Sequence, residues 1–221
     1  MEAREQPKAT SVLPRKRLWA VFVTVVALTA LGFFALGRLS AAPTVVPDAG
    51  PDAGFARDMQ THHAQAVEMA LLIRDKSENP EVRAIAYDIA TAQQHQNGQM
   101  FAWLQDWGLS QTGTAPPMAW MKADGTHDGA GASHGAPAAG GGNTMEGMAT
   151  QEQMQALRES SGAEAERLFV DLMIRHHQGG VAMATAGTRL AETSKVRDFA
   201  ARILEAQTAE IRALEELRGR L

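Results

Sequence analysis

Two pairs of adjacent histidines, each with methionines on both sides, are the residues of this sequence best suited to chemistry. His62-His63 follows Met59 in the pattern Met-x-x-His-His, and Met69 comes seven residues after the first histidine. The second half of the chain repeats the arrangement with Met173, His176, His177 and Met183. Neutral imidazole and thioether are typical ligands of Cu(I), whereas hard cations prefer oxygen. The residues alone leave two interpretations open, a soft-metal site or a purely structural polar core with methionine as filler.

The two pairs belong to an internal repeat. His176 lies 114 positions after His62, and the same shift superimposes Phe55 on Phe169 and many other identical residues without a gap. Each half has the periodicity of a helical hairpin, and one hairpin could hardly bury its apolar face alone. The sequence therefore predicts an all-α fold in which two repeated hairpins form a four-helix bundle.

Four long helices are expected to position these residues. The first hairpin comprises helices at about 52–76 and 80–107, separated at Asn79-Pro80, where Pro80 suits the first turn of a helix. The second comprises helices at about 163–192 and 194–217, preceded by a short helix at about 150–160. The bundle domain is thus residues 52–217, with repeat one at 52–107 and repeat two at 150–217.

One face of the 52–76 helix is predicted to point into the bundle. At about 100° per residue, Met59, His62 and Met69 fall on one stripe, and His63 lies at its edge. Arg57 lies on the opposite side and is expected to be solvated. Each half therefore directs two methionines and at least one histidine inward.

The partner helices carry polar residues on their apolar stripes. A buried polar group without a partner costs about 1–3 kcal/mol, and the histidines are the nearest candidates for partners. Such residues can fix the tautomer of an imidazole that binds a metal. We assign this supporting role to Gln93, Gln207 and Glu210. His95 lies on the other side of its helix and is expected at the surface.

Residues 108–149 have a different composition, rich in Gly, Ala, Pro, Ser and Thr, and are predicted to form a flexible loop. A second set of metal-ligating residue types is scattered in it. These could capture copper without a preformed geometry, and a linker of accidental composition is an equal alternative. The set is Met118, Met121, His127, His134, Met145 and Met148.

The N-terminal region is predicted to enter a membrane. Arg15-Lys16-Arg17 precedes an uncharged run at 18–37, which is long enough to span a bilayer. The basic cluster places residues 1–17 in the cytoplasm, and the linker 38–51 and the bundle outside. Cleavage after Ala42, which would make the protein secreted, is the alternative to an uncleaved anchor, and Pro43 disfavours it.

Composition excludes several classes of site. There is no cysteine, which rules out disulfides and thiolate metal sites. Six of the 21 basic and two of the 25 acidic residues precede residue 43, so the remainder has 15 basic and 23 acidic residues, a net charge of −8. This acidity argues against nucleic-acid binding. No predicted helix carries Glu-x-x-His or His-Glu-x-x-His, as di-iron and hydrolytic zinc sites require.

The motifs resemble a known bacterial family, the one catalogued as domain of unknown function 305. The resemblance covers about 52–217 and implies a ferritin-like four-helix bundle outside the inner membrane. Some members of that family bind copper and help cells tolerate it, so the resemblance also implies copper binding for this chain. Position 96 is Gln and position 97 is Asn where the family has Glu and Ile, which would alter the first half if that Glu were a ligand. The motifs are Phe55-x-x-Asp58-Met59-x-x-His62-His63, Met145-Glu146-Gly147-Met148, Met173-Ile174-Arg175-His176-His177-Gln178-Gly179-Gly180 with Met183, and Gln207-x-x-Glu210-Ile211.

Together these observations predict a membrane-anchored, extracytoplasmic protein that binds copper, as Cu(I), and buffers or hands it to copper-handling proteins. We expect a metal carrier and not an enzyme, and the sequence names no substrate for a redox enzyme using the same metal. The alternative is a structural or interaction bundle whose His, Gln and Glu form a buried polar network without metal.

Overall fold

The structure, a computed structural model, describes residues 14–40, 45–124 and 145–221, and these contain helices and no strand. The chain divides into two compact units, Met1–Thr44 and Val45–Leu221. The first contains α1 (Arg15–Ser40), whose stretch Arg15–Arg38 is long and apolar enough to cross a membrane. A helix of this kind near an N-terminus fits either a membrane span or a signal sequence.

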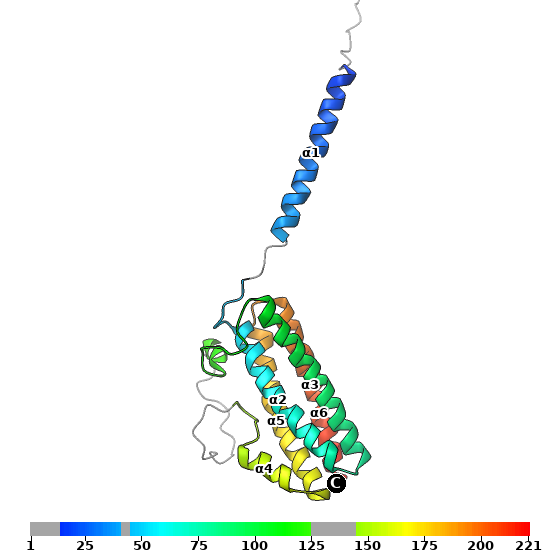
Figure 1. Ribbon diagram of the computed structural model, residues 1–221, viewed down its shortest axis with the longest axis vertical. Coiled ribbons are helices and arrows are strands. Elements are labelled where there is room, and N and C mark those ends of the chain that lie inside the picture. The colour runs from blue at the N-terminus through cyan, green and yellow to red at the C-terminus, as the bar shows by residue number, and fades with distance from the viewer. Residues whose placement is uncertain (1–13, 41–44, 125–144) are drawn as a thin grey trace, which may run out of the picture. The chain divides into compact units, whose positions relative to one another are not determined.

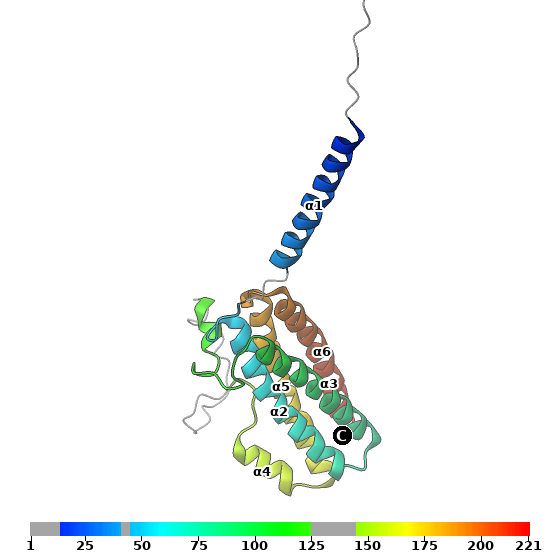
Figure 2. The same cartoon turned by 45° about the horizontal axis from the view of Figure 1, so that its top comes forward.

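The second unit is built from two helical hairpins. One consists of α2 (Pro51–Lys76) and α3 (Pro80–Asp106), the other of α5 (Gly162–Leu190) and α6 (Ser194–Arg218), as Figures 1 and 2 show. Two short elements join them, the 3-10 helix η1 (Ala119–Asp124) and α4 (Gln151–Glu159). The predicted all-α fold of two hairpins in a four-helix bundle is confirmed.

Local sequence explains where these helices begin. Pro51 and Pro80 occupy the first turns of α2 and α3, where proline removes no helical hydrogen bond. The Asn79 side chain accepts from the backbone N–H groups of Glu81 and Val82. Thr150 and Gln153 form a capping box at the start of α4.

The internal repeat is visible in the contacts that hold the hairpins together. Buried Asp52 accepts hydrogen bonds from the backbone N–H of Glu192, at 2.6 Å, and of Thr193, at 3.0 Å, where α6 begins. Its counterpart 114 positions later, Glu166, accepts from the Ser77 hydroxyl where the first hairpin turns. Each hairpin therefore ties down the turn of the other, and an approximate two-fold axis relates the halves.

The central helices α2 and α5 pack against each other in antiparallel orientation. Phe55, near the start of α2, lies against Gly187, near the end of α5, where a Cβ would come within 2.8 Å of the phenyl ring. Further along, the His62 and His176 rings meet. The antiparallel packing brings the two halves of the repeated motif to the same level of the bundle.

The bundle interior is split into two apolar clusters. The first apolar cluster includes Phe55, Met59, Met100, Trp103, Met183, Phe199 and Ile203. The second includes Met69, Ile73, Ile89, Phe169, Met173 and Leu214. Each helix of the central pair contributes to both, and the histidine pairs lie between the residues it contributes to each. The four buried histidines therefore form one layer across the middle of the bundle, apart from the buried Asp52, Ser77 and Glu166 at the hairpin turns.

The prediction that Arg57 is solvated was wrong. Only 10% of its side chain is exposed, because the chain on either side of the first hairpin folds over this end of α2. Its guanidinium donates to the carboxylate and backbone carbonyl of Asp48 and to the Ser110 carbonyl. Helical periodicity places Arg57 away from the bundle but cannot show that a loop covers that face.

Part of the segment predicted as a flexible loop is folded against α2. The Asp58 carboxylate accepts from the Met118 backbone N–H, at 2.7 Å, and from the Trp120 indole N–H, at 2.8 Å. Trp120 packs edge-on to Phe55 and fits over Gly54, where a Cβ would lie 2.5 Å from its ring. Burial raises the pKa of Asp58, with the hydrogen bonds and Arg57 acting in the opposite direction.

Candidate functional site

All four histidines of the repeated motif are fully buried in the layer between the two apolar clusters. His62 of α2 and His176 of α5 form its centre, with ring centroids 3.7 Å apart and ring planes inclined by 34°. His63, which the helical wheel places at the edge of the stripe, is as deeply buried as His62. The layer therefore joins the two halves of the repeat directly through imidazole.

The outer two histidines each have one hydrogen-bond partner on the neighbouring helix of the same hairpin. His63 Nε2 lies 2.6 Å from Gln96 Oε1, and His177 Nε2 lies 2.6 Å from Glu210 Oε2. In each case the ring N–H donates to the oxygen, so in a neutral ring the lone pair is on Nδ1. The two pairs have the same spacing of 33 residues, one ending in an amide and the other in a carboxylate.

The remaining ring nitrogens make no hydrogen bond of regular geometry within the described part of the chain, although the Glu146 carbonyl approaches His62 and the His62 carbonyl approaches His176. They are both nitrogens of His62 and of His176, and Nδ1 of His63 and of His177. Buried polar atoms in folded proteins are nearly always satisfied, because each unsatisfied one costs about 1–3 kcal/mol. Six imidazole nitrogens in one layer are thus available as ligands or hydrogen-bonding groups.

Burial keeps the imidazoles of His62, His63 and His176 neutral. It lowers the pKa of His62 to about 4, assisted by the nearby His177, and the Glu146 carbonyl acts in the opposite direction. It lowers the pKa of His63 to about 3, assisted by His62, and holds the pKa of His176 well below its ordinary value. Neutral imidazole is the form that can bind a metal ion, so near pH 7 these three rings are in the protonation state that ligation requires.

The four methionines of the motif lie on both sides of the layer. Met59 and Met183 belong to the first apolar cluster and Met69 and Met173 to the second, and all four are fully buried. Within residues 14–40, 45–124 and 145–221, no three His, Asp or Glu side chains are placed to hold a metal ion by themselves. The buried thioethers are thus further soft donor groups on either side of the imidazoles.

The residues expected to support the histidines divide into two groups. Glu210 contacts His177, whereas Gln93 and Gln207 are buried but make no side-chain hydrogen bond to a described residue. Gln207 lies so close to Gly180 that a Cβ there would overlap its amide. The expected Gln–His bonds are absent because the supporting position is one turn further along the helix. Gln96 was missed, although the repeat offset maps it onto Glu210.

The described methionines of the second set gather beside the first apolar cluster. Met145 is part of that cluster, and Met118, Met121 and Met148 pack against it. His127 and His134 lie outside the described residues. The signal for this arrangement is the doubled Met-x-x-Met spacing in a region otherwise rich in small residues.

Residues 145–149, here called the cover segment, lie over the α2–α5 pair at the level of the histidines. A hydrogen bond from Met148 N to Met145 O closes a turn in which Gly147 has φ +81°, a conformation that favours glycine. The Glu146 carbonyl lies against Gly179 of α5, where any Cβ would overlap it. The Gln65 side chain of α2 both donates to and accepts from the Ala149 backbone. The cover segment thus bridges the two central helices.

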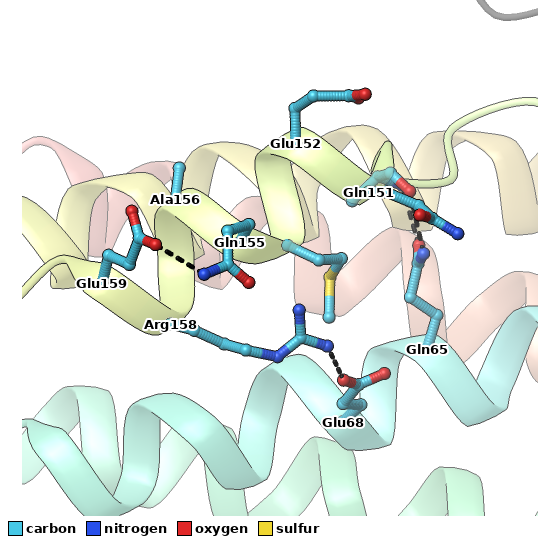
Figure 3. Close-up of a pocket in the computed structure, with 10 residues that line it drawn as sticks. Gln65, Glu68, Gln151, Glu152, Gln155, Ala156, Arg158 and Glu159 are labelled. Atoms are coloured by element: carbon cyan, nitrogen blue, oxygen red, sulfur yellow. Dashed lines mark hydrogen bonds and ion pairs between the residues drawn. The ribbon is translucent and has the colours of Figure 1, made fainter.

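Helix α4 continues from the cover segment and lies along α2 (Figure 3). At the C-terminal end of α4, the Lys76 ammonium of α2 donates to the carbonyls of Leu157 and Ser160. Arg158 of α4 forms an ion pair with Glu68 of α2. A polar cleft of ≈ 820 Å³ lies between the helices, lined by residues such as Gln65 and Glu68. These contacts anchor one end of the cover segment.

The fold and the site define a class: an antiparallel four-helix bundle of two related hairpins, with a His-His pair from each meeting in a buried central layer. The chain belongs to the family described as Domain of unknown function (DUF305), whose profile matches residues 52–218. The family resemblance carried by the motifs is confirmed.

Solved structures of the family share the architecture. A DUF305 protein from Streptomyces coelicolor is 38% identical, with TM-score 0.66, covering 77% of this chain and 94% of its own. A DUF305 fragment from Deinococcus radiodurans is 32% identical, with TM-score 0.61, covering 81% and 100%. CopM in its Cu(II)-bound form is 25% identical, with TM-score 0.55, covering 77% and 97%, and CopM has also been solved with Cu(I) and Ag bound. A comparison with curated proteins gives no match.

Proposed function

We propose that this protein is a membrane-anchored, extracytoplasmic metal-binding protein whose histidine layer takes a soft metal ion, foremost Cu(I). The observation that carries the proposal is the set of six imidazole nitrogens without a regular hydrogen bond in fully buried rings, flanked on both sides by buried methionines. If these nitrogens had no ligand or partner, a bundle with leucine at the same positions would be more stable.

The donor set fits copper in its reduced state. His62 and His176 would hold the ion from the two halves, with thioether from the Met59–Met183 side or the Met69–Met173 side. Cu(I) accepts such soft, neutral ligands and the low coordination numbers that a packed interior permits. Bound there, the ion would be sequestered from water and from oxidants. The structural likeness to CopM, which was solved with Cu(I), Cu(II) and Ag, supports the same class of metal.

The membrane topology is part of the proposal. Arg15, Lys16 and Arg17 form the first turn of α1, ahead of its apolar stretch, and this supports a topology with the N-terminal end in the cytoplasm and the bundle outside. As a retained anchor, α1 would keep the bundle at the outer face of the membrane, whereas cleavage after Ala42 would release it. The proposed role is copper buffering there, with delivery to or from other copper-handling proteins.

The test is a Cu(I) titration of the full chain in mild detergent under reducing conditions, against a competing chelator. The double variant His62→Ala/His176→Ala is expected to bind less Cu(I) than the wild type. The matched control is His95→Ala, because His95 is exposed and bonds only to Gln99 within the described residues. Equal binding by all three proteins would overturn the histidine layer as the copper site.

A purely structural polar layer is the second candidate, favoured by the His63–Gln96 and His177–Glu210 hydrogen bonds, which need no metal. The two functions predict different responses to Cu(I) in thermal unfolding. For a metal site, a free Cu(I) concentration about 100 times the dissociation constant would add about 2.7 kcal/mol of stability, whereas a structural layer would gain none. A wild-type melting temperature unmoved by Cu(I) would favour the structural layer.

A further inference from the structure

A groove lined by methionine lies on the outside of the bundle beside the cover segment. Its volume is ≈ 460 Å³, and Met118 and Met121 line one side. Glu146 of the cover segment, the basic residues Lys122 and Arg189, and small residues of α5 such as Ala182 line the rest. Both methionines are half-buried, so they pack against the first apolar cluster and remain partly accessible to solvent.

The methionines are fixed in place by the same contacts that fold this part of the loop. Asp58 accepts a hydrogen bond from the Met118 backbone N–H and another from Trp120, the residue just before Met121. Met118 has φ 63°, and Met121 N donates to Met118 O. The groove is therefore a built feature of the fold, anchored to α2 four residues before His62.

Glu146 of the cover segment contacts both this groove and the histidine layer. It lines the groove, and its backbone carbonyl lies against His62. Gly147 and Gly179 meet beside it, and a Cβ on Gly147 would lie 3.0 Å from the Gly179 nitrogen. The two glycines therefore allow the backbone at Glu146 to pack closely on α5, next to His62.

The approach from the opposite side of the layer leads to nitrogens that are already bonded. There Gln96 and Glu210 are partly exposed, but they are hydrogen-bonded to Nε2 of His63 and of His177. The groove leads instead to His62, whose ring nitrogens are approached by the Glu146 carbonyl but make no hydrogen bond of regular geometry in the described part of the chain.

We infer that the groove is the site where a soft metal ion first binds on its way to the buried layer. The thioethers of Met118 and Met121 capture the ion, which then passes the Glu146–Gly147 backbone to His62 by exchange of ligands, with no change of oxidation state. This inference rests on the proposed function and adds where metal enters and which residues set its rate.

The test is the rate of metal loading into the full chain in mild detergent, with Ag⁺ as the probe because it needs no reductant. Protein and Ag⁺ are mixed rapidly, the reaction is quenched with a thiol chelator at a series of times, and retained silver is counted. In Met118→Leu/Met121→Leu the side-chain volume is nearly conserved, so the fold is retained. The control is Met154→Leu, since Met154 belongs to the second apolar cluster and does not line the groove.

The groove variant is expected to load about tenfold more slowly than the wild type and to reach the same amount of silver at equilibrium, because association rates within a series vary by one to three decades. The control is expected to load at the wild-type rate. Equal rates for groove variant and wild type would overturn the access site alone. Loss of silver at equilibrium in the groove variant would also overturn it, by making these methionines the final ligands. A wild type that retains no silver would instead refute the proposed function.

Discussion

Lowering the pH of the metal-free protein from 7 to 5 tests the burial of the histidine layer directly. His62 and His63 have folded-state pKa values of about 4 and about 3, against 6.5 as the ordinary value. Between the folded and unfolded pKa values, the unfolded chain binds protons that the folded chain does not. The stability that these histidines contribute as neutral groups is therefore complete above about pH 6.5. The free energy of unfolding falls as the pH drops below that value.

The size of the effect follows from these shifts. One pKa unit corresponds to about 1.4 kcal/mol, so 1.5 pH units below 6.5 cost about 2 kcal/mol for each of His62 and His63. The two together lower the free energy of unfolding by about 4 kcal/mol at pH 5, and His176 acts in the same direction. Because domains are stable by only about 5–15 kcal/mol, this is a large fraction of the total. Asp58, whose pKa is raised, opposes the loss as the pH approaches its own titration.

The measurement is urea unfolding of the full chain in mild detergent at pH 7, 6 and 5, followed by far-ultraviolet circular dichroism with a chelator present. His62→Gln removes one titrating group and is expected to reduce the loss at pH 5 by about 2 kcal/mol. His95→Gln, on the exposed face of α3, is expected to behave as the wild type. A free energy of unfolding that is equal at pH 7 and pH 5 would refute the reasoning, since it would mean that the imidazoles are reached by water.

Two further predictions concern the contacts that hold the layer in place. Gly179→Ala puts a Cβ against the Glu146 carbonyl and is expected to destabilise the bundle by about 1–3 kcal/mol in the same urea assay. The control is Gly98→Ala on α3, where the added Cβ meets open space and is expected to stabilise the bundle by about 0.5–1 kcal/mol. Equal effects of the two glycine changes would show that the cover segment is not packed on α5. Asp52→Ala leaves the backbone N–H groups of Glu192 and Thr193 without their acceptor and is expected to cost about 1–3 kcal/mol. A loss smaller than about 0.5 kcal/mol would be evidence against this tie between the hairpins.

The fold and the inward orientation of His62 and His176 could be predicted because they depend on periodicity and on the repeat. The sequence left open whether the two halves share a site, because the contact between these rings depends on the antiparallel packing of α2 on α5. The depth of His63 was underestimated, since a residue at the edge of a stripe is covered only if the neighbouring helix lies on that side. Here α3 does, through Gln96.

The cover segment could not be derived from periodicity, because its place is set by contacts between residues far apart in the sequence. The Met145-Glu146-Gly147-Met148 motif marks a turn, but nothing local shows that Gly147 packs on Gly179. The burial of Arg57 has the same origin, since the chain that covers it comes from outside the helix. Helical periodicity describes the interior of the bundle and is silent about loops that cross its outer face.

For the proposed Cu(I) site, the charge in the layer favours one ion shared by the two halves. Burying a monovalent cation in an apolar interior is costly unless a negative charge lies nearby. In the described part of the chain, the one carboxylate that hydrogen-bonds to these histidines is Glu210, and its counterpart Gln96 is neutral. A separate Cu(I) in each half would leave one of them uncompensated, whereas the contact between His62 and His176 allows both halves to bind the same ion. We therefore expect one Cu(I) lost per chain in His62→Ala/His176→Ala, and a loss of two would show that each half holds its own.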